Sequence, residues 1–139
     1  MFNFVITNWM GLVVAVIAAM AIGAVWYSKI LFGKQWMEYA KIKEKDMKGA
    51  SAAKAYAIMV AVSAVSAIVL MRFLVIANPQ DIGQALKVGG WLWLGFVAPF
   101  VISATAFEKR PWGLAVIYLG NQLVTILAMT AILYYINLA

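Results

Sequence analysis

The residues of this chain that could do chemistry are few, and the most notable ones fall near the middle of long apolar segments. If these segments are helices, several hydroxyl and amide side chains lie at similar depths in a bilayer. Pro99 has no N–H, so the carbonyl of Gly95 loses its helical donor and can accept a hydrogen bond from Asn121 or Gln122. Such bonds either orient the helices or line a small cavity for a neutral solute. The predicted polar cluster comprises Ser63, Ser66, Gly95, Tyr118, Asn121, Gln122 and Thr125.

Charged side chains near the ends of the apolar segments form a second group. Arg72 stands about five residues before the end of its predicted helix, so an interfacial anchor is favoured over a buried functional cation. Glu108 follows the end of a predicted helix, where the macrodipole disfavours negative charge, and the basic residues of the following turn compensate it. A structural lock is therefore favoured over an ion-coupling carboxylate. The predicted charged lock comprises Arg72, Glu108 and Arg110.

Two residue types on which many active sites depend are missing from the sequence. The chain contains no Cys, no His and only five acidic residues. Thiolate chemistry and zinc, haem and iron–sulfur sites rely largely on Cys or His. No nucleophile stands beside an oriented base, so an enzyme is the weakest of the function classes. We expect no catalytic residue, no metal site and no cofactor.

Four long segments with almost no charge must position these residues. The composition is 66% hydrophobic and the mean hydropathy is +0.93, well above the balance of a soluble protein. A transmembrane helix needs ~20 mostly apolar residues, and each segment reaches or nearly reaches that length. The sequence therefore predicts an all-α polytopic membrane protein, one domain over residues 1–139 with four transmembrane helices in an antiparallel bundle. The predicted helices cover about residues 4–27, 52–77, 88–107 and 112–137, with a cytoplasmic interfacial helix in the loop 28–51.

The distribution of Lys and Arg predicts which side each loop faces. Nine basic residues belong to the stretch 28–54 and to positions 109–110, whereas Arg72 and Lys87 lie toward the other side. By the positive-inside rule, the basic loops face the cytoplasm and both termini are external. Positive charge follows the first apolar segment, so this segment is expected to be retained and not cleaved as a signal peptide. We expect a multi-pass membrane protein that contacts anionic lipid headgroups on the cytoplasmic side and binds no nucleic acid.

Small residues recur at every fourth position along the first predicted helix. Gly11, Ala15, Ala19 and Gly23 form this first-helix stripe. Stripes of this kind let helices approach closely in lipid, where apolar burial gives no advantage between helices. The second predicted helix carries a shorter stripe of three alanines. Packing within one chain is favoured for the stripes, and a subunit interface of a homo-oligomer is the alternative. The shorter stripe consists of Ala53, Ala57 and Ala61.

An aromatic and basic segment follows the first predicted helix. Trp and Tyr favour the headgroup level, where neighbouring lysines can reach lipid phosphates. Residues 36–48 have the composition of an amphipathic helix, with Glu44 four residues before Lys48 and Gly49 suited to end it. This segment is either a helix on an anionic leaflet or a solvated loop that sets the topology. The predicted interfacial motif comprises Trp26, Tyr27, Ser28, Phe32, Gly33, Lys34 and Trp36.

Several short motifs occur together across the chain. They are Trp26-Tyr27-Ser28, Leu31-Phe32-Gly33-Lys34, Trp36-Met37, Gly95-Phe96-Val97-Ala98-Pro99 and Phe107-Glu108-Lys109-Arg110-Pro111-Trp112. With these motifs the chain resembles the bacterial membrane proteins catalogued as domain of unknown function 1761, over nearly its whole length. The resemblance implies a four-helix inner-membrane protein and brings no established activity with it.

These observations favour one class of function and leave a second open. The favoured class is a small inner-membrane protein that acts as a non-enzymatic packing, oligomerising or accessory subunit. The alternative is a small oligomeric channel or transporter, in which the predicted polar cluster passes a small solute.

Overall fold

The computed structural model describes residues 9–139, and this part of the chain is helical with no strand. The first residues of the first predicted helix lie outside the described residues. Four helical spans are long and apolar enough to cross a membrane. The helices are α1 (Trp9–Trp26), α2 (Gly33–Ala40), α3 (Ala50–Ala77), α4 (Ile82–Leu92), α5 (Ala98–Glu108) and α6 (Trp112–Leu133). A 3₁₀ turn, η1 (Glu44–Met47), and two π turns, η2 (Trp93–Val97) and η3 (Tyr134–Leu138), complete the chain.

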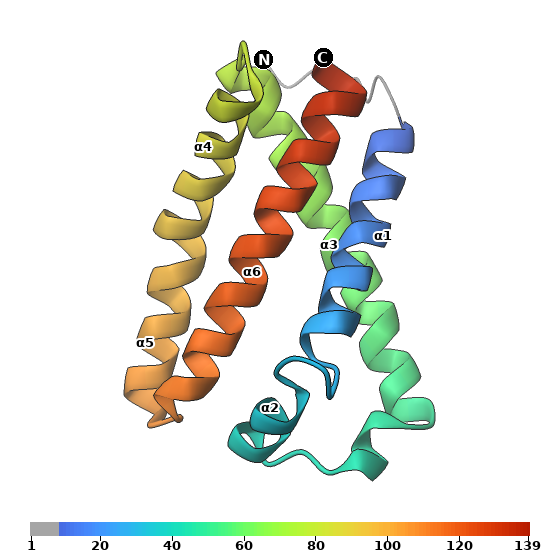
Figure 1. Cartoon of the computed structure of the whole chain (residues 1–139), viewed down its shortest axis with the longest axis vertical. Helices are drawn as coiled ribbons and strands as arrows, with labels where there is room; N and C mark the ends of the chain where they lie inside the picture. The colour runs from blue at the N-terminus through green and yellow to red at the C-terminus, as the bar shows by residue number, and fades with distance from the viewer. Residues whose placement is uncertain (1–8) are drawn as a thin grey trace.

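Helix α6 is the centre of the arrangement. It runs between α1 on one side and α4 with α5 on the other (Figure 1), and it contacts α1, α2, α3, α4 and α5. Helix α3 packs on α1 and reaches α4 near its own end. Alanines let α1, α3 and α4 approach closely here, and larger side chains fill the remaining space. The buried core consists of Leu12, Ala15, Ala19, Ala67, Leu70, Leu74, Ala85, Met129 and Leu133.

The third span begins at Ile82, which corrects the predicted start at residue 88. Asp81 is the N-cap residue, and its Oδ1 accepts a hydrogen bond from the backbone N–H of Gln84 at 2.8 Å. Asn78 ends α3 in the left-handed region, with φ of 47°. These two caps confine the connection to residues 78–81 and place Lys87 inside a helix. The prediction began the helix after Lys87, the last charged residue of the segment, and overlooked the stronger N-cap signal of Asp81.

The third span is interrupted where the sequence places Pro99. Because Pro99 cannot donate to the carbonyl of Gly95, the regular ladder cannot continue unchanged. The helix widens at this point into η2, in which the N–H of Ala98 donates to the carbonyl oxygen of Trp93 five residues earlier. Such π turns commonly mark a local irregularity within a longer helix.

The predicted helix over residues 36–48 is broken in two. Helix α2 ends at Lys41, whose φ of 56° lies in the left-handed region, and η1 follows three residues later. Glu44 forms an ion pair with Lys29 at 2.8 Å, although the sequence favoured Lys48. The pair lowers the pKa of the exposed Glu44 carboxyl and raises that of Lys29. The segment therefore folds back toward the end of α1.

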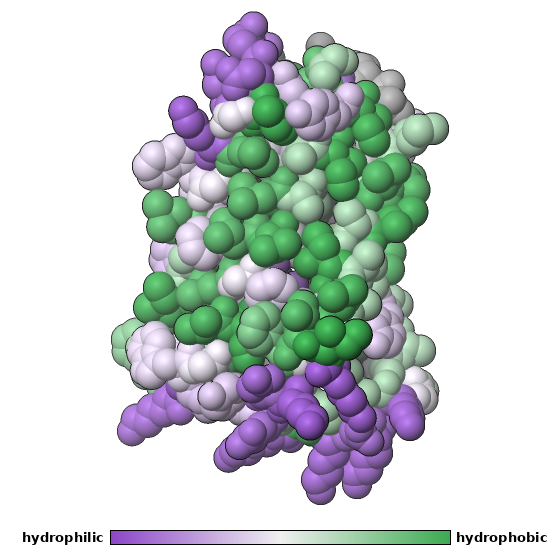
Figure 2. Space-filling model, in the orientation of Figure 1, coloured by the Kyte–Doolittle hydropathy of each residue, from purple (hydrophilic) through white to green (hydrophobic). Residues whose placement is uncertain are grey.

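The surface is divided into an apolar band and polar ends (Figure 2). Large hydrophobic side chains are exposed along the band, among them Phe96 at 75% and Phe107 at 88%. One end carries α2, η1 and the turn between α5 and α6, and the lysines of these segments are exposed. We call this the basic end. An apolar band around four long helices indicates a multi-pass membrane protein.

Candidate functional site

The predicted interfacial motif folds as a tight turn after α1. This turn places α2 against α6. The N–H of Phe32 donates to the carbonyl of Trp26 at 3.0 Å, and the N–H of Gly33 donates to that of Ser28 at 2.8 Å. A Cβ on Gly33 would lie 2.6 Å from the carbonyl oxygens of both Tyr27 and Ser28. Because these are backbone atoms, no side chain can replace the glycine without opening the turn.

Two glycines of α6 leave notches in the helix surface, and aromatic rings from this segment fill them. A Cβ on Gly120 would lie 2.8 Å from Trp26, and one on Gly113 would lie 2.6 Å from the ring of Tyr39. The glycines are seven residues apart, which is two helical turns, so both notches open on one face of α6. The Trp26 indole also donates to the carbonyl of Ile117 at 3.0 Å. These notches were not predicted, although the seven-residue spacing of the two glycines can be read from the sequence.

An aromatic cluster joins the turn, α2 and α6, and consists of Tyr27, Trp36 and Tyr118. The ring centroids of Tyr27 and Trp36 are 4.8 Å apart, and those of Tyr27 and Tyr118 are 6.4 Å apart. The Trp36 indole donates to the hydroxyl of Tyr118 at 3.4 Å. Burial raises the pKa of Tyr27 strongly, the nearby Tyr118 adds to this, and a hydrogen bond from Asn121 opposes it. The Tyr27 phenol therefore stays protonated.

Asn121 connects the aromatic cluster to the interior of the bundle. Its side chain is 5% exposed and interacts with the Tyr27 phenol, whose pKa it lowers. Its buried Oδ1 has no hydrogen-bond partner among the described residues. A buried carbonyl oxygen without a donor costs stability, so this oxygen is the least satisfied group of the cluster.

The structure brings together only part of the predicted polar cluster. Ser63 and Asn121 are buried, while Tyr118, Gln122 and Thr125 are partly buried. Ser66 and Gly95 are exposed, and a Cβ on Gly95 would meet nothing within 4 Å. The prediction was therefore wrong in placing these two residues in the interior.

A tryptophan supplies the polar link that the sequence assigned to the Gly95 carbonyl. Trp93, two residues earlier in η2, donates its indole N–H to the carbonyl of Leu119 on α6 at 3.0 Å. The bond ties the interrupted third span to the central helix. An indole N–H in an apolar environment needs an acceptor, so this contact also satisfies the buried donor.

The first-helix stripe packs within the chain. Gly11, Ala15 and Ala19 are buried, and Gly11 contacts the Asn137 side chain of η3. Gly23 differs, because a Cβ there would meet nothing within 4 Å. A contact that the sequence did not reveal joins α4 to α6, where a Cβ on Gly89 would lie 2.5 Å from the Thr130 hydroxyl.

The predicted charged lock is divided between the two ends of the molecule. Glu108 and Arg110 form an ion pair within the turn between α5 and α6, and both side chains are about half exposed. Arg72 is partly buried on α3, five residues before Ala77. That end of α3 lies opposite the α5–α6 turn (Figure 1). Glu108 and Arg110 of the predicted lock therefore lie together, and Arg72 lies at the other end of the molecule.

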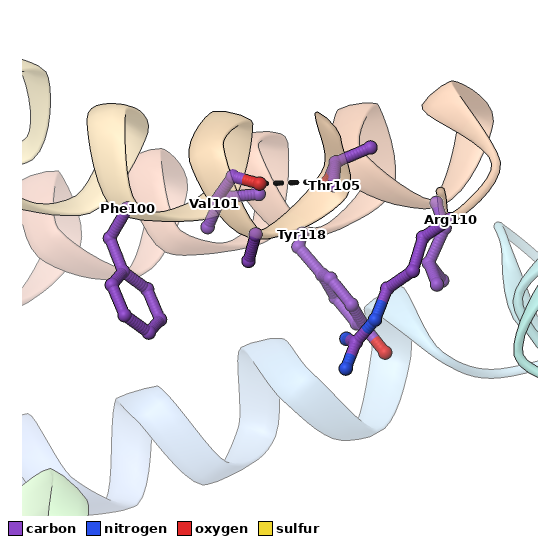
Figure 3. A pocket seen from close by; sticks show the side chains of 7 residues that line it. Phe100, Val101, Thr105, Arg110 and Tyr118 are labelled. Carbon is purple, nitrogen blue, oxygen red and sulfur yellow. Dashed lines mark hydrogen bonds between the residues drawn. The ribbon is translucent and has the colours of Figure 1, made fainter. Parts of the chain in front are cut away.

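A groove lies between α5 and α6 near the basic end, with a volume of about 200 Å³. One wall is a face of α5 and the other is a face of α6. On each helix the lining residues are three or four positions apart, so they lie on the same face. Thr105 is satisfied within its own helix, since its hydroxyl donates to the carbonyl of Val101 at 2.7 Å. Arg110 and Tyr118 both extend toward the same side of the groove (Figure 3). The groove is lined by Phe100, Val101, Ala104, Thr105, Arg110, Leu114 and Tyr118.

Comparison with known protein families gives a match over most of the chain. The family described as "Protein of unknown function (DUF1761)" matches residues 10–134. No curated protein and no solved structure matches the chain. The matched range covers the aromatic turn, the notches of α6 and the groove. The chain therefore belongs to the DUF1761 family.

Proposed function

We propose that this protein is a non-enzymatic membrane subunit that works by helix association, and that α3 is the helix that binds a second copy of the chain. The observation that carries the proposal is the exposure of α3 near the basic end. Every residue from Ala53 to Val62 is exposed, including the large side chains of Tyr56, Met59 and Val62. The buried positions of the same helix begin only at Ser63.

The shorter alanine stripe lies on this exposed part of α3. Ala53, Ala57 and Ala61 are all exposed, whereas Gly11, Ala15 and Ala19 are already used within the chain. Small residues at every fourth position let two backbones approach closely in lipid. This moves the candidate interface from the first-helix stripe, where the sequence first suggested it, to α3.

A second copy is the occupant that fits best. Two identical stripes can cross about a two-fold axis so that each alanine meets the same stripe on its partner, which is the usual symmetry of soluble homodimers. The stripe itself carries no charge, so no ionic group is buried at its centre. Lys54 lies beside the stripe, at the level where a long side chain can reach the headgroups.

We infer that the four spans alternate in direction and that the basic end faces the cytoplasm of a bacterial cell. The excess of Lys and Arg at that end supports this orientation through the positive-inside rule. Both termini are then external, and α2 with η1 rests at the cytoplasmic surface of the inner membrane. Anionic headgroups are the natural partners of this surface.

A small channel or transporter is less well supported. It needs polar groups that gather around a path through the bundle, but Ser66 and Gly95 are exposed. The unsatisfied Oδ1 of Asn121 is the one observation in its favour. The groove between α5 and α6 has mainly apolar walls.

The test is the mass of the purified protein in mild detergent, measured by light scattering. We expect the wild type to be a dimer or larger closed oligomer. Ala57→Leu places a bulky side chain at the proposed contact and should raise the dissociation constant at least about tenfold, the effect of roughly 1.4 kcal/mol. Ala55→Leu is the matched control, because Ala55 is also exposed but points to another face of α3.

Three outcomes contradict the proposal in whole or in part. A wild type that is monomeric at all concentrations removes the self-association, and equal effects of the two substitutions remove α3 as its site. Recovery of the chain bound only to a different protein supports an accessory role but contradicts the second copy as the occupant.

A further inference from the structure

The groove between α5 and α6 combines an apolar wall with cationic and hydroxyl groups at one end. Val101, Ala104 and Leu114 provide apolar surface, and the Thr105 hydroxyl donates within its own helix. Phe100 borders the groove and is 75% exposed, so the groove opens toward the surface that faces hydrocarbon.

The polar end of the groove offers donors to an anion. The Arg110 Nε pairs with Glu108, which leaves the terminal amino groups of the guanidinium as the donors directed into the groove. Figure 3 shows the Arg110 side chain leaning back along α6 toward Tyr118. The Tyr118 hydroxyl accepts from the Trp36 indole and keeps its own proton for a further acceptor.

The start of α6 adds a favourable electrostatic contribution at the same place. Pro111 is the N-cap residue, and no side chain caps the first turn. The N–H groups of Trp112 and Gly113 have no helical acceptor, and the positive end of the helix dipole lies here. Glu108 opposes an anion, but its ion pair with the Arg110 Nε offsets its charge.

We propose that this groove binds one anionic glycerophospholipid from the leaflet at the basic end. The phosphate contacts the Arg110 guanidinium, with the Tyr118 hydroxyl beside it, and the first part of one acyl chain lies along Ala104 and Leu114. Arginine suits a phosphate because its planar donors can bind two oxygens at once. The volume of about 200 Å³ is below the range of roughly 300–1,000 Å³ for drug-sized ligands, which fits a chain segment rather than a whole solute.

The experiment measures lipid retained by the full-length protein in detergent, by native mass spectrometry. Dioleoyl phosphatidylglycerol is the probe, and dioleoyl phosphatidylcholine is its neutral counterpart. We expect one tightly held molecule of the anionic lipid. Arg110→Gln should lower its affinity about tenfold, because one charge-assisted contact is lost. Lys109→Gln is the matched control, since it removes the same charge from the neighbouring residue and should change the affinity by no more than about twofold.

A second variant tests the apolar wall without changing the charge. Ala104→Leu fills the groove, so the anionic lipid should bind more weakly while the thermal unfolding temperature confirms that the variant is folded. Inorganic phosphate should not displace the lipid at concentrations that leave the protein folded, since it lacks an acyl chain.

Four results would overturn the lipid site. Equal losses for Arg110→Gln and Lys109→Gln would reduce the effect to general surface charge. Unchanged binding to Ala104→Leu would remove the acyl chain from the groove. Displacement by inorganic phosphate alone would make the site a phosphate site, and equal retention of both lipids would remove the role of charge.

Discussion

At the scale of single residues, glycines determine how the aromatic side chains of the family motif pack. Gly113 and Gly120 leave space on α6 for Tyr39 and Trp26, and Gly33 lets the turn after α1 close. In lipid, association between helices depends on this kind of close contact, because burial of apolar side chains brings no hydrophobic gain. The aromatic residues that resemble headgroup anchors in the sequence are therefore also packing residues.

Gly120→Ala tests the notch that holds Trp26. The added Cβ would lie 2.8 Å from the indole ring, whose N–H is bound to Ile117, so we expect a loss of about 1–3 kcal/mol in stability. Gly90→Ala is the control, because a Cβ there meets nothing within 4 Å and alanine favours a helix by up to ~1 kcal/mol. Thermal unfolding in detergent, followed by tryptophan fluorescence, distinguishes the two. Similar unfolding temperatures for both variants would show that the notch does not matter.

Tyr27→Phe tests the polar contact of the aromatic cluster. The substitution removes the hydroxyl that interacts with the buried Asn121 amide, so we expect a loss of about 1 kcal/mol. Tyr39→Phe keeps the ring that fills the Gly113 notch and should leave stability nearly unchanged. The measurement is again the free energy of unfolding in detergent. If the two hydroxyl deletions cost the same, the contact between Tyr27 and Asn121 contributes nothing.

The sequence revealed the members of the site better than their contacts. Asn121 was identified as a buried polar residue because it stands in the middle of an apolar segment, where a polar group is informative. Its partner, Tyr27, could not be identified, because that contact depends on how the turn after α1 returns to α6. Gly95 was misplaced for a similar reason, since residue type and depth do not show which face of an interrupted helix meets a neighbour.

At the scale of elements, charge and length were sufficient to locate the four spans. The boundaries needed finer signals, as the early start of α4 at the Asp81 cap shows. The break between α2 and η1 could not be foreseen, because Glu44 pairs with Lys29 on an earlier segment and not with Lys48 on its own. Local periodicity contains no information about such a contact.

Gly33→Ala tests how the turn after α1 positions α2. The Cβ would meet the backbone of Tyr27 and Ser28, which cannot move aside as a side chain can, so α2 should detach from α6. Gly49→Ala is the comparison, because Gly49 has a φ of 81° and a ψ of −157° but no close neighbour. Its cost of about 1–3 kcal/mol is backbone strain at the start of α3 and should leave α2 in place on α6. Limited proteolysis of residues 28–49 reports the detachment. Equal protection in the two variants would contradict this role of Gly33.

At the scale of the whole molecule, the separation of charge predicts the orientation in the membrane. Reporters inserted at Gly49, within the basic end, should read as cytoplasmic, whereas reporters after Ala139 or at Gly83 should read as external. Gly83 lies in the first turn of α4, just after the short connection of residues 78–81, so an insertion there needs flexible linkers on both sides. A cytoplasmic C-terminus would reverse the orientation and place the basic end outside.

The exposed part of α3 is the feature that links the fold to the proposed function. A helix that packs on the bundle over one part and is exposed on every side over the rest leaves its small residues available to a partner. Because the chain contains no cysteine, single cysteines can report contacts between copies without a background.

Oxidative crosslinking of single-cysteine variants in native membranes tests this claim most directly. Ala57→Cys should form a disulfide-linked dimer, since the Cα atoms of two crossing helices at small residues can approach within the ~7 Å that a disulfide allows. Ala55→Cys, on another exposed face of α3, and Ala15→Cys, buried within the chain, should remain monomeric under the same conditions. A dimer that forms equally at Ala55 and Ala57, or at neither, would contradict association through α3.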